Sequence, residues 1–436
     1  MSAAKLLLPA KIIWTGQLKN LGHCTRQIQH CLRLHRKNFL VNAFLLQATP
    51  QTAHQGLASF ALTAEEKQSL PPKSMQCFAF DLGRVLFDFD YEIALNKLKH
   101  KITASSEEVV NELLANNFAD DFEKGLISSQ NFYDKFKNKF NASVTYQEFV
   151  DIWCDIFSPN VEMIDLATKL SLIYPVYLIS NINELHFEYL HKKYPETFAI
   201  FNELILSFKV KSLKPEKAIY EELRKVSKCK YEDIIYIDDR HDLIHQAKQL
   251  KLSAIHFNTF NDLITDLETL HIDIPSDKEI KTLKCLKSKI ENHKNTLVVG
   301  MGNLLKSDDG VGVRIIQKIK DTTRLNIIEA GTALESYLSK IANYGSDLVV
   351  FVDAASLEAK ETFGCYETSD INAISVYFTH DTSLKLVTQY LQNQKAFDIL
   401  ILAIGAHNFS FGENLGKEVK RAETLISNFF IKNFPA

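Results

Sequence analysis

The chain has 436 residues, more than one typical hydrophobic core accommodates, so two or three domains are expected. Hydrophobic residues make up 46% and charged residues 24%, an ordinary balance for a globular protein in water. The net charge of −3 argues against nucleic acid as a partner, no apolar run is long enough for a membrane span, and the scattered cysteines favour a reducing, cytoplasmic environment over a disulfide framework.

The first 74 residues form a basic extension. Residues 1–64 contain several Lys and Arg but no Asp or Glu. A transit peptide, a basic tail that contacts an acidic partner, and a poorly ordered extension all have this composition, whereas Lys11 interrupts the apolar stretch that a signal peptide needs. We expect an extension of unassigned role, followed by a module that begins near Met75.

A first series of strands and helices is expected over residues 75–272. Short apolar runs that end in polar residues are typical of buried parallel strands, and they occur at residues 77–83, 176–181, 234–239 and 253–258. Helical periodicity from about 91 to 170 predicts a helical insertion between the first two strands. Residues 273–294 are charged and poor in core residues, so a partly helical linker is expected there.

A second series is expected over residues 295–436. Its predicted strands are residues 296–303, 325–332, 348–356 and 397–406, and its predicted helices include 311–320 and 415–434. The expected fold class is therefore α/β, with two three-layer αβα modules built on mainly parallel sheets.

Polar motifs follow three strands of the first series, and a lysine lies between two of them. These motifs are Asp81 in FDLG, Ser180 and Asn181 in LISN, Lys214 in LKPEK, and Asp238 and Asp239 in YIDD. A carboxylate can accept a phosphoryl group as a nucleophile, and Mg²⁺ would offset the charge of neighbouring carboxylates and phosphate. A hydroxyl, an amide and an ammonium group can hold phosphate oxygens. The set predicts phosphoryl-transfer chemistry.

In this order the motifs resemble the haloacid dehalogenase superfamily, specifically its helical-cap phosphatases with a DLG opening. The resemblance implies a HAD-like domain over 75–272 with a cap at about 91–170. It implies that Asp81 is the catalytic nucleophile and that Ser180, Asn181 and Lys214 bind phosphate. The Mg²⁺ ligands would be Asp81, the backbone of Gly83, Asp238 and Asp239.

Gly83 departs from the superfamily pattern, because most of its phosphatases carry a general-acid aspartate at that position. The proton for the leaving group must then come from another residue. The module is either a phosphatase for a small phosphorylated substrate or a catalytically weak domain kept for recognition.

The stretch GMGNLLKSDDGVGV at 300–313 joins a predicted strand to a helix through a glycine-rich loop. A dinucleotide-binding turn is one alternative, but Leu305 replaces the third glycine of that motif. The acid pair Asp308 and Asp309 would also repel a pyrophosphate, whereas it suits a cation or a helix cap.

Two further residues complete a possible metal-contacting set. Asp353 ends a predicted strand, and His380 follows in YFTHDT. Two carboxylates and one imidazole that meet at one edge of a parallel sheet leave open positions on a transition-type ion.

This arrangement resembles the hydrogenase maturation endopeptidases, which have a phosphorylase/hydrolase-like fold. The matching pieces are GMGNLLKSDDGVGV, EAGTA, LVVFVDAAS, THD and AIGAHNFSFGENLGKEV, in that order over 295–436. The resemblance implies that Asp309, Asp353 and His380 contact the Ni²⁺, or a similar divalent ion, of the substrate, with Asp308 as the alternative to Asp309.

The implied activity is removal of a C-terminal extension from the precursor of a [NiFe]-hydrogenase large subunit after nickel insertion. No Ser/His/Asp or Cys/His pair has convincing spacing, so the proteolytic nucleophile is unassigned. Water activated by a carboxylate or a metal is the chemistry left. The alternative function is a small-molecule phosphomonoesterase whose C-terminal module is only a binding domain.

Overall fold

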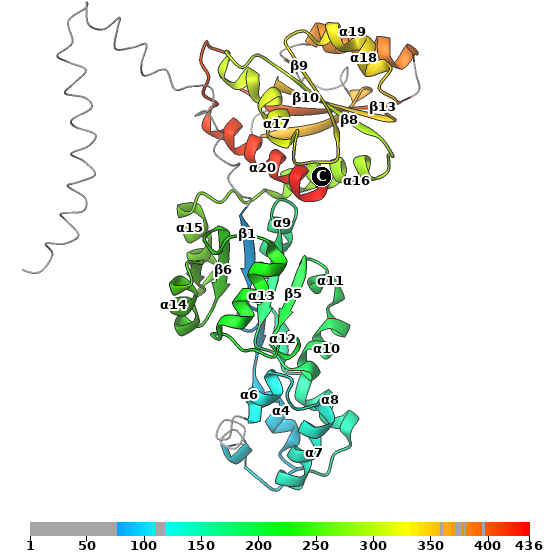
Figure 1. The fold of residues 1–436 in the computed structure, drawn as a ribbon. Helices are drawn as coiled ribbons and strands as arrows, with labels where there is room; N and C mark the ends of the chain where they lie inside the picture. The colour runs from blue at the N-terminus through cyan, green and yellow to red at the C-terminus, as the bar shows by residue number, and fades with distance from the viewer. Residues whose placement is uncertain are drawn as a thin grey trace, which may run out of the picture. The chain divides into compact units, whose positions relative to one another are not determined.

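In a computed structural model, the chain divides into two units, Met1–Lys73 and Ser74–Ala436. The structure describes residues 76–105, 107–109, 118–357, 361–370, 377–378, 381–394 and 397–436. All of these belong to the second unit, which is coloured in Figure 1. The predicted basic extension and His380 lie outside the described residues.

The first module is built on a parallel sheet with the strand order β5-β4-β1-β6-β7. The strands are β1 (Cys77–Phe80), β4 (Val176–Ser180), β5 (Glu203–Leu206), β6 (Ile234–Asp238) and β7 (Ser253–His256). Four of them follow the predicted runs. β5 was not predicted, because this short edge strand has one exposed and one half-buried residue at its start and therefore lacks a continuous apolar run.

Alternation along β1 gives this sheet two covered faces. Phe78 and Phe80 join a core that includes α9, α10 and α15, whereas Cys77 and Ala79 pack with α13 and α14. The helices of the two layers and the short segments between them are α9 (Val161–Ser171), α10 (Glu184–Lys193), α11 (Pro195–Phe198), α12 (Ser207–Val210), α13 (Lys217–Ser227), α14 (His241–Gln249) and α15 (Phe260–Thr269).

The predicted helical insertion forms a cap with its own core. Its elements are α4 (Tyr91–Leu98), α6 (Phe118–Glu123), α7 (Ser129–Phe140), α8 (Tyr146–Cys154) and the paired short strands β2 (Phe87–Phe89) and β3 (Phe157–Pro159). Aromatic rings in mutual contact fill this core, including Phe132, Phe136, Phe149 and Trp153. The cap ends near β3, earlier than predicted, because Met163, Leu166 and Leu170 direct α9 onto the sheet.

The second module has a mainly parallel sheet with the strand order β11-β13-β10-β8-β9, and β12 also pairs with β10. The strands are β8 (Thr296–Met301), β9 (Asn326–Gly331), β10 (Leu348–Ser356), β11 (Phe363–Glu367), β12 (Tyr377–Phe378) and β13 (Asp398–Gly405). β11 and β12 are antiparallel additions that the sequence did not predict.

Helices cover both faces of this sheet as well. Val298, Val350 and Leu402 face one layer of helices, and Leu297, Phe351 and Ile401 face the other. The first layer holds α16 (Asp277–Glu291), α17 (Val311–Ile319) and α20 (Lys417–Asn433), and the second holds α18 (Leu338–Ala342) and α19 (Asp381–Gln394). The prediction of two αβα modules with mainly parallel sheets is confirmed.

Residues 273–294 are more than a linker. They contain α16, which begins with a capping box between Ser276 and Glu279 and buries Leu283, Leu286 and Ile290. The segment looks charged in sequence because its lysines occupy the outer face of an amphipathic helix, while the apolar residues recur at helical spacing on the inner face.

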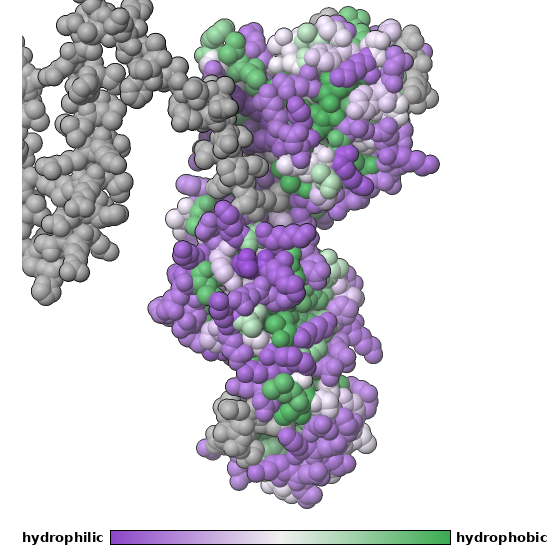
Figure 2. Space-filling model, in the orientation of Figure 1, coloured by the Kyte–Doolittle hydropathy of each residue, from purple (hydrophilic) through white to green (hydrophobic). Residues whose placement is uncertain are grey.

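Among the described helices, none combines the length and apolar character needed to cross a membrane. On the face of the molecule shown in Figure 2, hydrophilic residues cover most of the coloured surface and hydrophobic groups form smaller areas.

Candidate functional site

The first site lies where β1 and β6 end. These strands are neighbours, so Asp81, which follows β1, meets Asp238, the last residue of β6. Ligand atoms of Asp81, Asp238 and Asp239 all lie within 4.8 Å of one another. The structure therefore brings together the three predicted carboxylates, and such an oxygen-rich, negatively charged group suits a hard divalent cation such as Mg²⁺.

Lys214 neutralises part of this charge. Its Nζ lies 2.6 Å from Asp81 Oδ1 and 2.7 Å from Asp238 Oδ2, and all three side chains are buried. Burial raises the pKa of Asp81 to about 7, against the opposing effect of the Lys214 ammonium. Burial alone would lower the pKa of Lys214, but the two carboxylates outweigh it and raise that pKa. The lysine is a fixed positive charge beside the predicted nucleophile.

Asp238 is held in place by its own neighbours. The Tyr236 hydroxyl donates to Asp238 Oδ2, and the Arg240 backbone N–H donates to Oδ1 over 2.9 Å. Burial and the Asp238 charge raise the pKa of the Tyr236 hydroxyl, so it stays a donor. These contacts fix the carboxylate at the edge of the sheet.

The Asn181 amide, which was predicted to bind phosphate, contacts the Lys214 backbone in the structure. Its Oδ1 accepts from the Lys214 backbone N–H over 2.7 Å, and its Nδ2 donates to the Lys214 carbonyl over 3.0 Å. Both polar atoms of the amide are thus used to position the lysine. Ser180 lies beside it, is buried, and ends β4 at the same edge of the sheet. Sequence reasoning could not separate these roles, because an amide suits either of them.

Gly83 lies in the turn between β1 and β2 and forms a bridge with Phe87. A Cβ atom at this position would stand 3.0 Å from Cε1 of the Phe89 ring. An acidic side chain here would have to displace that ring. The turn is therefore built without the acid that the resemblance leads one to expect.

Sequence reasoning missed Glu123, a half-buried residue at the end of α6 in the cap. Burial, with the neighbouring Asp120 charge, raises the pKa of Glu123 to about 7, while Lys214 and Arg240 oppose that rise. Nothing in the local sequence FADDFE marks this glutamate, since its importance comes from where the cap meets the sheet module.

The second site is built around close backbone contacts in the loop after β8. Gly302 has φ +121°, and a Cβ atom there would lie 1.8 Å from the carbonyl oxygen of Asp309. A Cβ atom on Gly312 would lie 2.3 Å from the Val352 carbonyl oxygen of β10. The glycines allow the short helical turn Ser307–Gly310 and the start of α17 to press against the sheet, which explains the glycine pattern without a nucleotide.

Asp308 organises a distant loop. Its Oδ2 accepts from the backbone N–H groups of His407 (3.2 Å) and Asn408 (2.9 Å), and its Oδ1 accepts from Gly416 N–H over 2.7 Å. Asp308 is buried and both of its oxygens are occupied. This arrangement argues against Asp308 as the alternative metal-contacting residue.

Asp309 is oriented differently from its neighbour. It is buried, and its Oδ2 accepts from the Asn303 backbone N–H over 2.9 Å. The turn that carries Asp309 packs against β10, the strand that contains the fully buried Asp353. The antiparallel pairing of β12 with Ala355 and Ser356 brings residues 377–378 to the same strand. Two of the predicted residues thus lie on contacting elements, and the third lies outside the described residues.

Exposed apolar side chains flank this site. Phe411 is 83% exposed, and Leu305 and Phe409 are also exposed. They lie on the two loops that Asp308 joins, and the backbone pairs of Gly412 with Leu305 and Ser307 hold these loops together. Large apolar side chains on a restrained surface are typical of sites that contact another protein.

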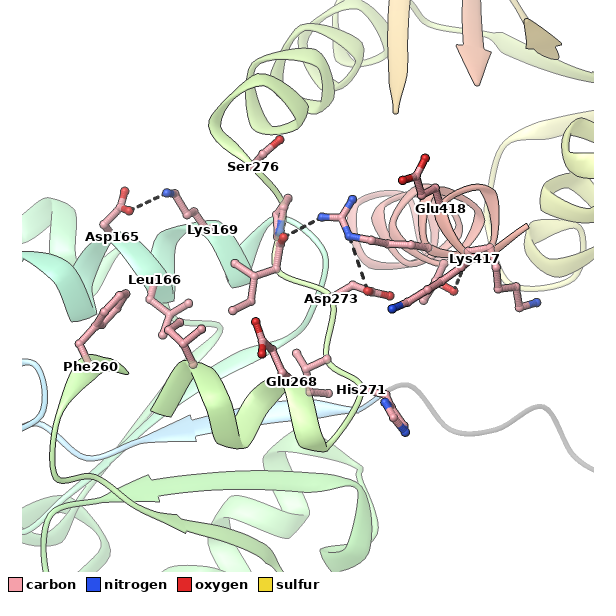
Figure 3. Close-up of a pocket in the computed structure, with 17 residues that line it drawn as sticks. Asp165, Leu166, Lys169, Phe260, Glu268, His271, Asp273, Ser276, Lys417 and Glu418 are labelled. Carbon is pink, nitrogen blue, oxygen red and sulfur yellow. Dashed lines mark hydrogen bonds and ion pairs between the residues drawn. The ribbon is translucent and has the colours of Figure 1, made fainter. Parts of the chain in front are cut away.

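A separate cavity of about 980 Å³ is lined by residues of α9, α15, residues 271–276 and α20 (Figure 3). Its charged residues form ion pairs, such as Lys169 with Asp165 and Arg421 with Asp273. No catalytic motif of the sequence falls on its lining residues, so this cavity is a weaker candidate for a reaction site than the two sheet edges.

Comparison with curated proteins finds several relatives, among them two that are named as hydrolases. A Methanocaldococcus jannaschii protein assigned by name to the hydrogenase maturation proteases is 25% identical over 158 residues, or 34% of this chain and 92% of the relative. The D-ribitol-5-phosphate phosphatase of Bacteroides thetaiotaomicron is 23% identical over 179 residues, or 39% of this chain and 86% of the relative. A drimenol cyclase of Aspergillus calidoustus is 21% identical over 233 residues, and the chain spans 41% of it.

Solved structures that are similar to parts of the chain are also found. A HAD-family enzyme of Bacteroides thetaiotaomicron is 25% identical, with 44% of this chain and 99% of that chain covered and a TM-score of 0.41. The [NiFe] hydrogenase maturation protease HycI of Thermococcus kodakarensis is 26% identical, with 34% and 99% covered and a TM-score of 0.29. No protein-family profile matches. The curated relatives support the predicted fusion of a HAD-like module with a maturation-protease-like module, and both kinds of relative are hydrolases.

Proposed function

We propose that the second module is an endopeptidase that removes the C-terminal extension of a [NiFe]-hydrogenase large-subunit precursor once nickel is in place. The observation that carries this proposal is the division of work between two adjacent acids. Both carboxylate oxygens of Asp308 accept hydrogen bonds from the loop at 407–416. Asp309 accepts one from a backbone N–H group and lies on a turn that packs against the strand of Asp353. The relative assigned to the maturation proteases supports the choice of reaction.

In this proposal Asp309, Asp353 and His380 contact the nickel ion of the substrate, so that only the nickel-loaded precursor is recognised. Two carboxylates and an imidazole are suitable ligands for such an ion and leave positions for the ligands of the precursor. The exposed Phe411 and Leu305 would contact the polypeptide around the scissile bond. A water molecule activated by a carboxylate or by the metal is the proposed nucleophile.

The test is incubation of the full chain with a nickel-loaded large-subunit precursor, read by mass. Loss of the C-terminal extension is expected with wild type and not with Asp309→Asn. Normal processing by Asp309→Asn would show that this residue does not read the metal. The same assay with nickel-free precursor tests whether the metal is recognised at all.

We propose that the first module is a Mg²⁺-dependent phosphomonoesterase. Its support is the cluster of Asp81, Asp238 and Asp239, together with Lys214, at one edge of a parallel sheet. These residues fit a hard cation, since carboxylate oxygens are its preferred ligands and a cation would relieve their mutual repulsion. Mg²⁺ would supply charge neutralisation for the phosphate.

The residues of the first module would then divide the work. Asp81 attacks phosphorus, Lys214 holds the nucleophile and the phosphate oxygens in place, Ser180 donates to phosphate, and Asn181 positions Lys214. The curated polyol-phosphate phosphatase supports a small phosphorylated alcohol as the substrate class. The scattered cysteines are consistent with work in the cytoplasm.

Turnover of small phosphomonoesters with Mg²⁺ tests this second proposal. Wild type should hydrolyse para-nitrophenyl phosphate or D-ribitol 5-phosphate, and Asp81→Asn should not. A phosphatase that processes no precursor would favour a second module that only binds. Capture of the precursor without either activity would favour a non-catalytic scaffold.

A further inference from the structure

The turn after β1 poses a chemical problem for the proposed phosphomonoesterase. An alcohol leaves as an alkoxide unless it receives a proton, and position 83 carries a glycine against the Phe89 ring. A proton donor must therefore come from another element that reaches the carboxylate cluster.

The end of α6 in the cap is fastened to the sheet module. The Ser207 hydroxyl donates to the Glu123 carbonyl over 2.7 Å and to the Ile182 carbonyl over 3.1 Å. The Ile182 backbone N–H in turn donates to the same hydroxyl over 2.9 Å. Ser207 thus ties the residue after the Ser180–Asn181 pair directly to Glu123.

Two more contacts secure the residues that follow. Lys211 Nζ donates to the Gly125 carbonyl over 2.6 Å, and Lys124 pairs with Glu216 at 2.6 Å. Lys211 and Glu216 flank Lys214 in sequence. The end of α6 therefore packs against the loop that contains Lys214.

Glu123 interacts electrostatically with charged groups of the site. The groups that act on it electrostatically come from four elements: Lys214, Arg240 at the start of α14, Asp81 after β1, and Asp120 on α6 itself. The Tyr91 hydroxyl of α4 is also affected by the Glu123 charge. Because Ser207 holds the Glu123 backbone beside Ile182, this glutamate belongs to the part of the cap that adjoins the carboxylate cluster.

We propose that the Glu123 carboxyl group is the general acid of the first module and supplies the proton that residue 83 cannot. This inference rests on the proposed phosphomonoesterase function. Half-burial keeps Glu123 within reach of substrate, and its pKa of about 7 keeps a large fraction protonated at neutral pH.

The reaction balances with these groups. An Asp81 oxygen bonds to phosphorus, the bond from phosphorus to the ester oxygen breaks, and that oxygen takes the proton of Glu123 as the alcohol leaves. Glu123, now a carboxylate, accepts a proton from water as the water oxygen attacks the phosphoaspartate. The bond between phosphorus and Asp81 breaks, which gives inorganic phosphate, free Asp81 and protonated Glu123.

The test compares two substrates with Glu123→Gln in the full chain with Mg²⁺. D-Ribitol 5-phosphate has a poor leaving group that needs a proton, whereas para-nitrophenyl phosphate has a good one that does not. We expect kcat/KM for the polyol phosphate to fall about 100-fold or more and that for the aryl phosphate to change less than about threefold. Retained aryl phosphatase activity also shows that the variant is folded.

Asp121→Asn is the matched control, because it removes a charge from the same helix outside the site. It should leave both rates near wild type. In wild type, kcat/KM for the polyol phosphate should fall on the alkaline side of the pH profile, where Glu123 loses its proton, and this descending limb should vanish in Glu123→Gln.

Equal losses with both substrates, or no loss with either, would overturn the role of Glu123 while leaving the phosphomonoesterase intact. No turnover of either substrate by wild type would instead overturn the proposed function, and the role of Glu123 with it.

Discussion

The Asp308 carboxylate accepts a hydrogen bond from the backbone N–H of Gly416, 2.7 Å away and 108 positions later in the chain. With the bonds from His407 and Asn408, this contact joins the loop after β8 to the loop before α20. Asp309, its neighbour, makes none of these contacts in the described structure and accepts from Asn303 instead. The two adjacent acids therefore have separate hydrogen-bond partners, and we propose that they also have separate roles.

Two matched substitutions should therefore affect different properties of the protein, one its stability and the other its activity. Asp308→Asn places an amide donor among three N–H groups and should lower the free energy of unfolding by about 2–3 kcal/mol. Asp309→Asn can still accept from Asn303 and should change stability by less than about 1 kcal/mol while abolishing precursor processing. Denaturant unfolding and the mass of the precursor measure the two effects. Equal destabilisation by both variants would refute the division of roles.

Gly302 tests the backbone geometry of the same site. A Cβ atom would meet the Asp309 carbonyl at 1.8 Å, and φ +121° is strained for any L side chain. Gly302→Ala should therefore displace Asp309. We expect it to lower both the rate of precursor processing and the free energy of unfolding. Gly345→Ala is the comparison, since a Cβ atom there meets nothing within 4 Å although φ is also positive. Similar processing by both variants would mean that the close approach is unimportant.

Lys214 should matter more for activity than for folding. Lys214→Met removes the only cation that the described structure places within ion-pair distance of both Asp81 and Asp238, so their repulsion is relieved mainly by Mg²⁺. We expect phosphomonoesterase activity to fall about 100-fold or more and thermal stability to depend more strongly on Mg²⁺ than in wild type. Thermal unfolding with and without Mg²⁺ measures this, and an unchanged Mg²⁺ response would contradict it.

Arg421 on α20 forms an ion pair with Glu279 on α16, in which the glutamate is buried and the arginine is partly exposed. Burial alone would raise the pKa of Glu279, but hydrogen bonds from Arg421, Thr362 and the Ser276 backbone outweigh it and lower that pKa. Arg421→Ala leaves the buried carboxylate without this cation and should cost about 2–3 kcal/mol of stability. Lys417→Ala, an exposed lysine in the first turn of the same helix, should cost less than about 1 kcal/mol.

The lowered pKa of Glu279 also fixes the sign of a pH effect. A carboxyl whose folded pKa is depressed stabilises the fold above its unfolded pKa, about 4.3, and loses that contribution as pH falls through the folded value. The stability difference between wild type and Arg421→Ala should therefore shrink below about pH 4. A difference that is constant from pH 7 to pH 3 would show that the ion pair is not the cause.

Much of the fold could be predicted because its strands are buried on both faces. VVG in β8, VVFV in β10 and ILILAI in β13 are continuous apolar runs, and polar residues follow where chemistry occurs. The added antiparallel strand β11 was missed, since FGCYE is short and half-exposed. α16 was taken for a linker because its exposed lysines outnumber its buried leucines.

The sequence predicted which residues form the candidate sites better than it predicted what each residue contacts. Asp81, Lys214 and Asp238 meet because strand order brings their elements to one edge of the sheet. The positioning task of Asn181 and the loop contacts of Asp308 depend on tertiary partners far away in the chain. Glu123 was invisible for the same reason, because only the docking of the cap brings it to the site.

The most direct test of the account is the mass of a nickel-loaded [NiFe]-hydrogenase large-subunit precursor after incubation with the full chain. The account predicts one cleavage that removes the C-terminal extension with wild type, no cleavage with Asp309→Asn, and no cleavage of nickel-free precursor by either. An uncleaved nickel-loaded precursor with wild type, or the same product with Asp309→Asn, would contradict it.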